Sequence, residues 1–479
     1  MSATQVKAKV MGYLPNDVPP LGQLVLLGFQ HVLTMFPATV LVALLVGFHV
    51  STVLMASGMA TIVALIGSRL ATGKFIPLYY GSSFSYIAAT LAITHANFGE
   101  PAPDELISAA QAGIVATGLV NIATGLAIRW AGGKSAIDKI LPPVVTGSVA
   151  TVIGFGLGKA ALDMAGGTCC GTSGSGPWWF VAITTLVATI LFSVYLQGRG
   201  FIGMIPILLG AIVGYIVAAI VGAIMPDSGV APNYAAITQS PLLTAPHITL
   251  PNFTHPMATT AIISIAVMAI ATIPESTAHL YQISLYVDHL AEELGRPRLW
   301  LNRYIGINLV LDGLGDMVNG LLGGVAGTNY GENNSLMAIT RNYSGPALLA
   351  AGAIAILLSF SGTLAGIVNS VPTAVSGGLA IYLFGVIGLQ GIALMMSERV
   401  NLFDPQQLAI GAVIMIIGIG GNIGFPDGFI PVPILRSIFP NGLPAIATGA
   451  VAGILLNLLF MVVPAPEARP AVTAPTPEV

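Results

Sequence analysis

Apolar windows long enough to cross a bilayer follow one another along almost the whole chain. They form two sets of seven, separated by a more polar stretch at 226–256, and each window of about 20 residues predicts one membrane-spanning segment. The windows lie at 21–44, 51–70, 77–95, 107–130, 137–162, 178–196 and 201–225, and then at 257–286, 304–322, 325–343, 347–368, 371–396, 408–420 and 442–463. The pattern therefore predicts an all-α polytopic membrane protein with 14 transmembrane segments.

Composition supports the membrane location and narrows the function. Hydrophobic residues make up 55% of the chain, charged residues 7%, and the mean hydropathy is +0.87. A soluble core could not hide so much apolar surface. The net charge of −3 and the lack of a basic patch argue against a nucleic-acid partner. The sequence also lacks the Gly-x-Ser-x-Gly, phosphate-loop and His-Glu-x-x-His patterns, so no enzymatic activity is expected.

The distribution of basic residues predicts an orientation. With a cytoplasmic N-terminus, 14 of the 16 Lys and Arg residues fall on the cytoplasmic side, and only Lys159 and Arg436 fall elsewhere. Because cytoplasmic loops are enriched in Lys and Arg, both termini are expected to be cytoplasmic, in the cell (inner) membrane. Residues 1–20 then form an N-terminal tail, 226–256 an extracytoplasmic linker, and the Pro-rich segment 464–479 a disordered C-terminal tail.

Two short stretches of the chain repeat each other. Tyr, Gly, Ser, Ala and Thr at positions 80, 81, 85, 88 and 90 recur at 330, 331, 335, 338 and 340. The first copy enters from the cytoplasmic side and the second leaves toward it, so the two repeats have opposite orientations. A second echo relates 142–158 to 372–388. The sequence therefore predicts two inverted repeats of seven spans each, at 21–225 and 257–463.

Each copy contains a glycine that can interrupt a helix. The residues before Gly81 (Tyr79-Tyr80) and before Gly331 (327–330) favour an extended strand. Extended backbone inside a membrane needs hydrogen-bond partners. We therefore expect two short antiparallel strands, in segments 3 and 10, that cross near the midplane. Each would be followed by a half-helix whose positive N-terminus faces a shared pocket.

Ionisable residues in apolar segments indicate where that pocket lies. Glu275 and His279 are four residues apart, on one face of a predicted helix, and Glu332 follows the second glycine. An ionisable group at such depth faces a cavity or a partner rather than lipid. One alternative is that Glu275 and His279 only satisfy each other between packed helices. A metal site formed by these residues is not expected, because no Cys or second His shares the face.

These residues together resemble a known family. The chain is similar to the nucleobase-ascorbate transporter family, with the bacterial uracil permeases as the nearest branch. The similarity covers the membrane region from residue 21 to 463. It rests on Thr328-Asn329-Tyr330-Gly331-Glu332-Asn333 with Met337-Ala338-Ile339-Thr340-Arg341, on Glu275 with His279, and on Gly81-Ser82-Ser83-Phe84.

The resemblance implies an architecture and a mechanism. A core domain of spans 1–4 and 8–11 would move against a gate domain of spans 5–7 and 12–14, in a protein that is often a homodimer. The transported solute would be a nucleobase, carried in symport with a proton and without any other cofactor.

The resemblance also implies roles for individual residues. Glu275 and Glu332 would hydrogen-bond the base, and the backbones of Phe84 and Gly331 would contact it. His279, supported by Tyr330, would lie beside the base. The remaining matched positions are Ala38 and His31 in the first span, and Ser83 and Asn333 within the motifs. Ser335 departs from the pattern, since relatives usually have Gly there. Asp312 and Asp316 are expected to make structural hydrogen bonds rather than to bind substrate.

Several functions remain open at this stage. Uracil is favoured over a purine such as xanthine, because purine-type relatives tend to carry Gln-Asn where this chain has Glu332-Asn333. An anion transporter of the same fold would need Arg or Lys at the start of a half-helix, and neither start has one. A membrane scaffold without transport activity would have no need of buried carboxylates. Glu332 is the expected proton carrier, with His279 and Glu275 as alternatives.

Overall fold

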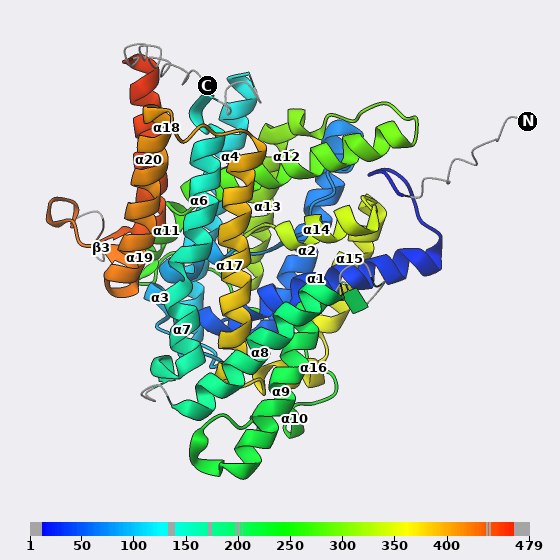
Figure 1. The fold of residues 1–479 in the computed structure, drawn as a ribbon, viewed down its shortest axis with the longest axis vertical. Coiled ribbons are helices and arrows are strands. Elements are labelled where there is room, and N and C mark those ends of the chain that lie inside the picture. Colours follow the sequence, from blue (N-terminus) through cyan, green and yellow to red (C-terminus); the bar gives the residue numbers. More distant parts are fainter. Residues whose placement is uncertain are drawn as a thin grey trace, which may run out of the picture.

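The computed structural model describes residues 12–132, 139–170, 175–196, 205–436 and 442–463, together with 199, 202, 203 and 439. The predicted tails lie largely or wholly outside the described residues. This part of the chain is mostly helical (Figure 1). Within it, eleven helical stretches are long and apolar enough to cross a membrane. The chain is therefore a multi-pass membrane protein.

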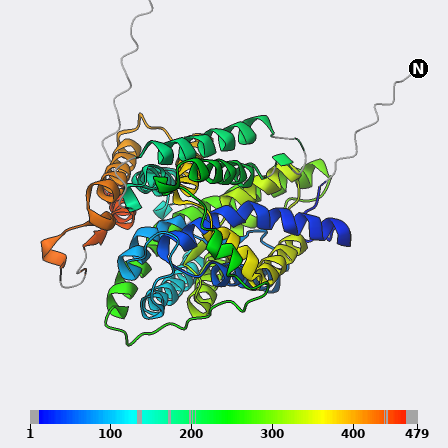
Figure 2. The ribbon, with the colours of Figure 1, turned by 90° about the horizontal axis from the view of Figure 1, so that it is seen from below.

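The long helical stretches occupy eleven of the predicted windows. In the first half they are α1 (Leu21–Val46), α2 (Val50–Thr72), α4 (Asp104–Trp130), α6 (Pro143–Gly156) with α7 (Gly158–Gly166), α8 (Gly176–Tyr195) and α9 (Pro206–Ile224). In the second half they are α11 (Ala258–Ala266) with α12 (Ala269–Glu293), α13 (Ile305–Leu322), α17 (Thr373–Ser397), α18 (Pro405–Met415) with α19 (Gly421–Gly424), and α20 (Ala445–Val462). The last helices, coloured orange and red, lie along one edge of the molecule in both views (Figures 1 and 2).

The other three windows contain shorter elements. Strand β1 (Tyr80–Ser82) leads through a short 3-10 turn into α3 (Ile87–Thr94), and strand β2 (Gly327–Asn329) leads directly into α14 (Gly331–Thr340). The third of these windows holds α15 (Gly345–Ser359) and α16 (Gly362–Asn369). The linker contributes the short helix α10 (Tyr234–Thr238). A second strand pair, β3 (Phe429–Ile430) with β4 (Leu443–Pro444), was not expected from the sequence.

The predicted strand pair is confirmed. Strands β1 and β2 pair antiparallel, with Tyr80 opposite Asn329 and Gly81 opposite Thr328. The first strand extends further than expected, because it continues from Tyr80 through Gly81 to Ser82 before the half-helix begins. A Cβ atom at Gly81 would lie 2.5 Å from Cζ of Tyr330, so this glycine leaves room for the tyrosine ring. The role of Gly81 is therefore steric.

Side chains of neighbouring helices satisfy the backbone of the two strands. The Ser57 hydroxyl of α2 donates to the carbonyl oxygen of Tyr80 at 2.6 Å. The carboxylate of Asp316 on α13 accepts from the Gly327 amide at 2.7 Å and from the Asn121 side chain at 3.0 Å. These bonds replace water, which a membrane interior does not supply. The prediction that Asp316 makes structural hydrogen bonds is confirmed.

Glycines bring several helix pairs into close contact. At the crossing of α4 and α13, a Cβ atom on Gly313 would lie 2.4 Å from the carbonyl oxygen of Gly118. At the crossing of α6 and α17, a Cβ atom on Gly154 would lie 2.2 Å from the amide nitrogen of Gly388. Small residues at such crossings are typical of membrane helices, whose association depends on close packing.

We expect Gly313→Ala to lower the thermal unfolding temperature of the detergent-purified protein. The added methyl group meets backbone rather than a flexible side chain, and overpacking of this kind costs about 1–3 kcal/mol. Gly385→Ala is the matched control, because a Cβ atom on Gly385 of α17 has no neighbouring atom within 4 Å. Alanine is the better helix former, so the control should unfold at the same temperature or higher. Equal unfolding temperatures for the two variants would contradict this account of the crossing.

Candidate functional site

A cavity of about 860 Å³ begins at the strand pair and continues to the loop that follows α12 and the C-terminal end of α17. Its inner end is formed by β1, the turn before α3, α12, the start of α14 and α17. The residues that line this inner end are Ser82, Ser83, Phe84, Glu275, His279, Tyr330, Gly331, Glu332 and Gln390. Most of the residues singled out in the sequence analysis therefore meet in one cavity.

Glu275 enters the cavity from α12, directly after the proline inside that helix. Its side chain is half-buried, and its Oε2 accepts a hydrogen bond from the Ser85 hydroxyl at 3.4 Å. Ser85 belongs to the turn that begins α3. The hydroxyl of Ser83 caps the same turn by accepting from the Ser85 amide at 3.3 Å. The carboxylate is thus held against the start of the first half-helix.

The second carboxylate lies at the start of the second half-helix. Glu332 is in the first turn of α14, and the side chain of the N-cap residue Tyr330 makes no hydrogen bond to the amides at that end of the helix. Gly331 allows close approach there, since a Cβ atom on it would lie 2.9 Å from Nε2 of His279. The helix end therefore presents amide donors and a carboxylate acceptor to the same space.

A chain of hydrogen bonds orients His279. Its Nδ1 lies 2.9 Å from Oδ1 of Asn329, and the Asn329 amide group donates to the Ser276 hydroxyl at 2.8 Å. Because the Asn329 oxygen is the acceptor, Nδ1 carries the proton and Nε2 is left on the side of Gly331. The resemblance implied that Tyr330 supports His279. In the structure, the hydrogen-bond partner of the His279 ring is Asn329.

The Tyr330 hydroxyl instead makes its contacts where the two strands cross. It donates to the carbonyl oxygen of Ser82 at 2.9 Å and lies 2.9 Å from the hydroxyl of Thr39 on α1. The ring of Phe84 meets Phe384 of α17 edge to face, with 5.3 Å between the ring centroids. Aromatic side chains therefore flank the cavity where the half-helices begin.

Three of the expected site residues do not line the cavity within the described part of the chain. Ala38 and His31 are buried on α1, and Asn333 is buried on α14. The Asn333 side-chain amide lies 3.1 Å from Nδ1 of His31 and donates to the His31 carbonyl oxygen at 3.1 Å. Asn333 and His31 therefore connect the second half-helix to α1, and the phenol of Tyr330 occupies the α1 side of the crossing.

Sequence reasoning missed Gln390. This side chain comes from α17, lines the cavity, and has its Oε1 3.4 Å from where a Cβ atom on Gly331 would be. The available signal was a single amide side chain in the otherwise apolar window 371–396. It had no neighbouring motif to mark it.

The ionisable side chains along the cavity are mostly acidic. Among the described lining residues, Arg298 is the only Lys or Arg, and it pairs with Glu292 at the outer end. The lining carboxylates are Glu275, Asp288, Glu292, Glu332 and Glu398. A cavity lined mainly by acidic side chains does not favour the binding of an anion.

Comparison with known proteins assigns the chain to a family. The family model described as "Permease family" (Xan_ur_permease) matches residues 22–426. A protein named uracil permease from Bacillus caldolyticus is 35% identical over 93% of this chain and 94% of its own length. The uracil permease of Escherichia coli K12 is 32% identical over 94% of both chains.

Solved structures of other transporters share the fold. The transmembrane domain of a cyanobacterial bicarbonate transporter, BicA, superposes with a TM-score of 0.58 at 15% identity, covering 93% of this chain and all of that one. Murine Solute Carrier 26 family member A9, an anion transporter in the inward-facing state, gives a TM-score of 0.56 at 13% identity, over 94% of this chain and 69% of that one. At these identities the likeness concerns the fold alone.

The sequence matches extend over nearly the full length of the relatives and include both half-helices and the whole inner end of the cavity. They confirm the family resemblance found in the sequence and agree with the absence of enzyme motifs. The chain belongs to this permease family, and it is a membrane transporter rather than an enzyme.

Proposed function

We propose that this protein imports a nucleobase, namely uracil, together with a proton. The observation that carries the proposal is the meeting of Glu275 and Glu332 at the inner end of one cavity, beside the start of α14. Relatives of nearly equal length that are named uracil permease support the choice of uracil.

The chemistry of the site fits a neutral planar base. Uracil presents N–H donors beside carbonyl acceptors. Carboxylates accept from the donors, and amides at the start of a half-helix donate to the carbonyl groups. Phe84 offers a ring face to the base, and the Gln390 amide offers one donor group and one acceptor. Sites of this kind discriminate strongly against analogues that lack one hydrogen-bonding group.

The charge of the cavity argues against the rival function. The solved structures with this fold include transporters described as carrying bicarbonate or anions. In this chain the inner end of the cavity is lined by two carboxylates, and the lining guanidinium of Arg298 is already paired with Glu292. A purine such as xanthine remains the alternative substrate within the family.

Transport by alternating access fits the placement of the cavity. Fourteen spans in two inverted repeats would give a core domain with α1 to α4 and α11 to α16, and a gate domain with α6 to α9 and α17 to α20. Phe84 and Glu332 would then belong to the core, and Phe384 and Gln390 to the gate. With cytoplasmic termini, the outer end of the cavity near Arg298 faces the cytoplasm. We also propose that two copies of this protein form a homodimer.

We expect saturable uptake of radiolabelled uracil into proteoliposomes that contain the purified protein. Unlabelled uracil in excess should abolish the uptake, whereas sulfate and bicarbonate should leave it unchanged, because the inner end of the cavity lacks an unpaired cation in the described residues. Competing xanthine tests the purine alternative. Inhibition by anions but not by bases would overturn the proposed substrate class.

A further inference from the structure

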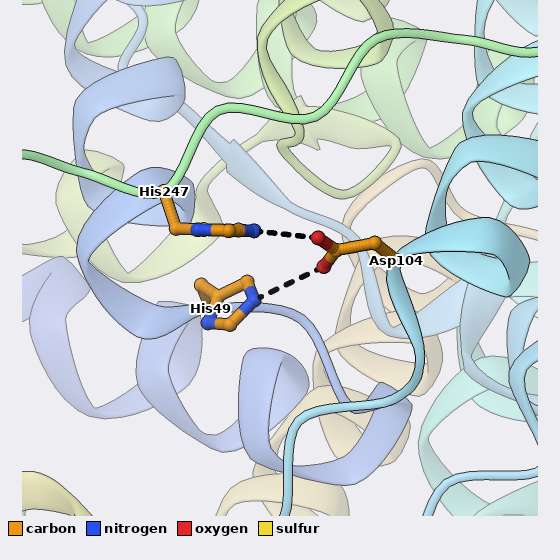
Figure 3. A group of neighbouring side chains, drawn as sticks. All are labelled: His49, Asp104 and His247. Atoms are coloured by element: carbon orange, nitrogen blue, oxygen red, sulfur yellow. Dashed lines mark hydrogen bonds and ion pairs between the residues drawn. The ribbon is translucent and has the colours of Figure 1, made fainter.

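Three side chains outside the cavity meet at one place in the structure (Figure 3). His49 stands just before α2, Asp104 begins α4, and His247 lies in the linker 226–256. Nε2 of His247 is 2.9 Å from one carboxylate oxygen of Asp104, and Nε2 of His49 is 3.7 Å from the other. Figure 3 shows both imidazole rings directed at the same carboxylate.

The spacing of these atoms matches a metal site. One nitrogen from each histidine and one oxygen of the carboxylate all lie within 4.8 Å of one another. Zinc binds such atoms at about 2.0–2.2 Å in a tetrahedral arrangement, which places neighbouring ligand atoms about 3.3 Å apart. The nitrogen of His247 lies 2.9 Å from one oxygen of Asp104 and that of His49 lies 3.7 Å from the other, so each imidazole already has a carboxylate oxygen near that separation. Small side-chain movements would therefore suffice to surround an ion.

The surroundings of His49 also suit a ligand. Its Nε2 is buried and makes no hydrogen bond within the described part of the chain. An imidazole nitrogen without a hydrogen bond can offer its lone pair to a metal. His247 and Asp104 are about half exposed, so an ion can reach the cluster from solvent.

The backbone holds the three segments together without help from these side chains. The Thr52 hydroxyl donates to the carbonyl oxygen of His247 at 2.7 Å. The amide of Ala102, near the start of α4, donates to the carbonyl oxygen of Gly47 at 2.8 Å. The ligand positions are therefore set before any ion binds, which lowers the cost of binding.

We propose that His49, Asp104 and His247 form a binding site for a divalent transition-metal ion, best matched by zinc, that fastens the 226–256 linker to the starts of α2 and α4. Imidazole nitrogen and carboxylate oxygen are ligands that zinc prefers. Three protein ligands leave one coordination position to water. The site is separate from the cavity, because none of its three residues lines that cavity. It does not depend on which solute the protein carries.

The test measures zinc binding to protein purified with a tag that contains no histidine and stripped with EDTA. Calorimetry and elemental analysis should give one zinc ion per chain, and zinc should raise the thermal unfolding temperature. The near-isosteric variants His247→Gln and Asp104→Asn should each weaken zinc binding at least about tenfold and remove that rise, because each lacks one ligand.

His255→Gln is the matched control, because His255 lies in the same linker and, among the described residues, its Nδ1 accepts a local bond from the Met257 amide. This variant should bind zinc as the wild type does. Equal weakening in His255→Gln, or no zinc-dependent rise in the wild type, would reduce the cluster to an adventitious site. A zinc X-ray absorption spectrum of the wild-type protein needs no variant. Nitrogen and oxygen ligands near 2.0 Å support the proposal, and sulfur ligands contradict it.

Discussion

Replacement of Glu275 by alanine is expected to abolish measurable uracil binding. The carboxylate lines the inner end of the cavity and is held by Ser85 at 3.4 Å. Its removal leaves an N–H donor of the bound base without its acceptor at the inner end of the cavity, at about 1–3 kcal/mol for a neutral partner and more for a charged one. The dissociation constant should therefore rise about a hundredfold or more. Calorimetry on the purified variant measures it.

Glu398→Ala is the matched control for this experiment. Glu398 lines the outer end of the same cavity and is exposed at the C-terminal end of α17. Its loss changes the charge of the cavity without touching the inner end, so affinity for uracil should stay within about twofold of wild type. If Glu275→Ala folds correctly and still binds uracil at wild-type affinity, Glu275 is a structural residue and the proposed site is wrong.

Replacement of Glu332 by glutamine is expected to uncouple uracil transport from the proton gradient. Glutamine keeps the size and one hydrogen-bond acceptor of the side chain but cannot take up a proton. Removal from water disfavours the charged form of any carboxyl group, which is what a proton carrier in a membrane requires. In Glu332→Gln, exchange of uracil across proteoliposome membranes should persist, while accumulation driven by an inward proton gradient should disappear.

The same assay distinguishes the other possible proton carriers. Gradient-driven accumulation at the wild-type level in Glu332→Gln would remove Glu332 from the proton path. His279 would then be the next residue to test, because its Nε2 lies on the side of Gly331 while Asn329 holds Nδ1. Asp312 is the other option, since it is buried and its Oδ1 has no hydrogen-bond partner among the described residues.

Solved structures described as anion or bicarbonate transporters share the fold of this permease. In this chain, the half-helix starts carry Phe84 and Glu332, with Glu275 facing them from α12. A carboxylate at the positive end of a helix neutralises the feature that an anion would use. The fold supplies the two half-helix starts, and on the proposed function the acidic side chains beside them select a neutral base over an anion.

Much of the architecture could be predicted from the sequence. The long apolar windows became helices, and Gly81 and Gly331 marked the strand pair between β1 and β2. Glu275, His279 and Glu332 do line one cavity. These features are encoded locally, because a membrane span must satisfy its own backbone and an ionisable group inside it must face something polar.

The partners of the polar side chains could not be predicted in the same way. The family resemblance implied that Tyr330 supports His279, but in the structure the His279 ring is bonded to Asn329 and the Tyr330 hydroxyl lies beside that of Thr39. Gln390 belongs to no recognisable motif, so the sequence did not mark it as a site residue. Whether two polar groups meet depends on the packing of helices from distant parts of the chain.

The sequence by itself thus determined the membrane class, the strand pair, and the residue types available for substrate binding. Each follows from composition or from a pattern within a few turns of helix. Only the tertiary structure decided which of those residues face the cavity and which lie buried beside it, as Ala38 and His31 do. It alone brought His49, Asp104 and His247 together. A hydrogen bond or a metal ligand is defined over about 3 Å, and only the packed chain fixes distances that short.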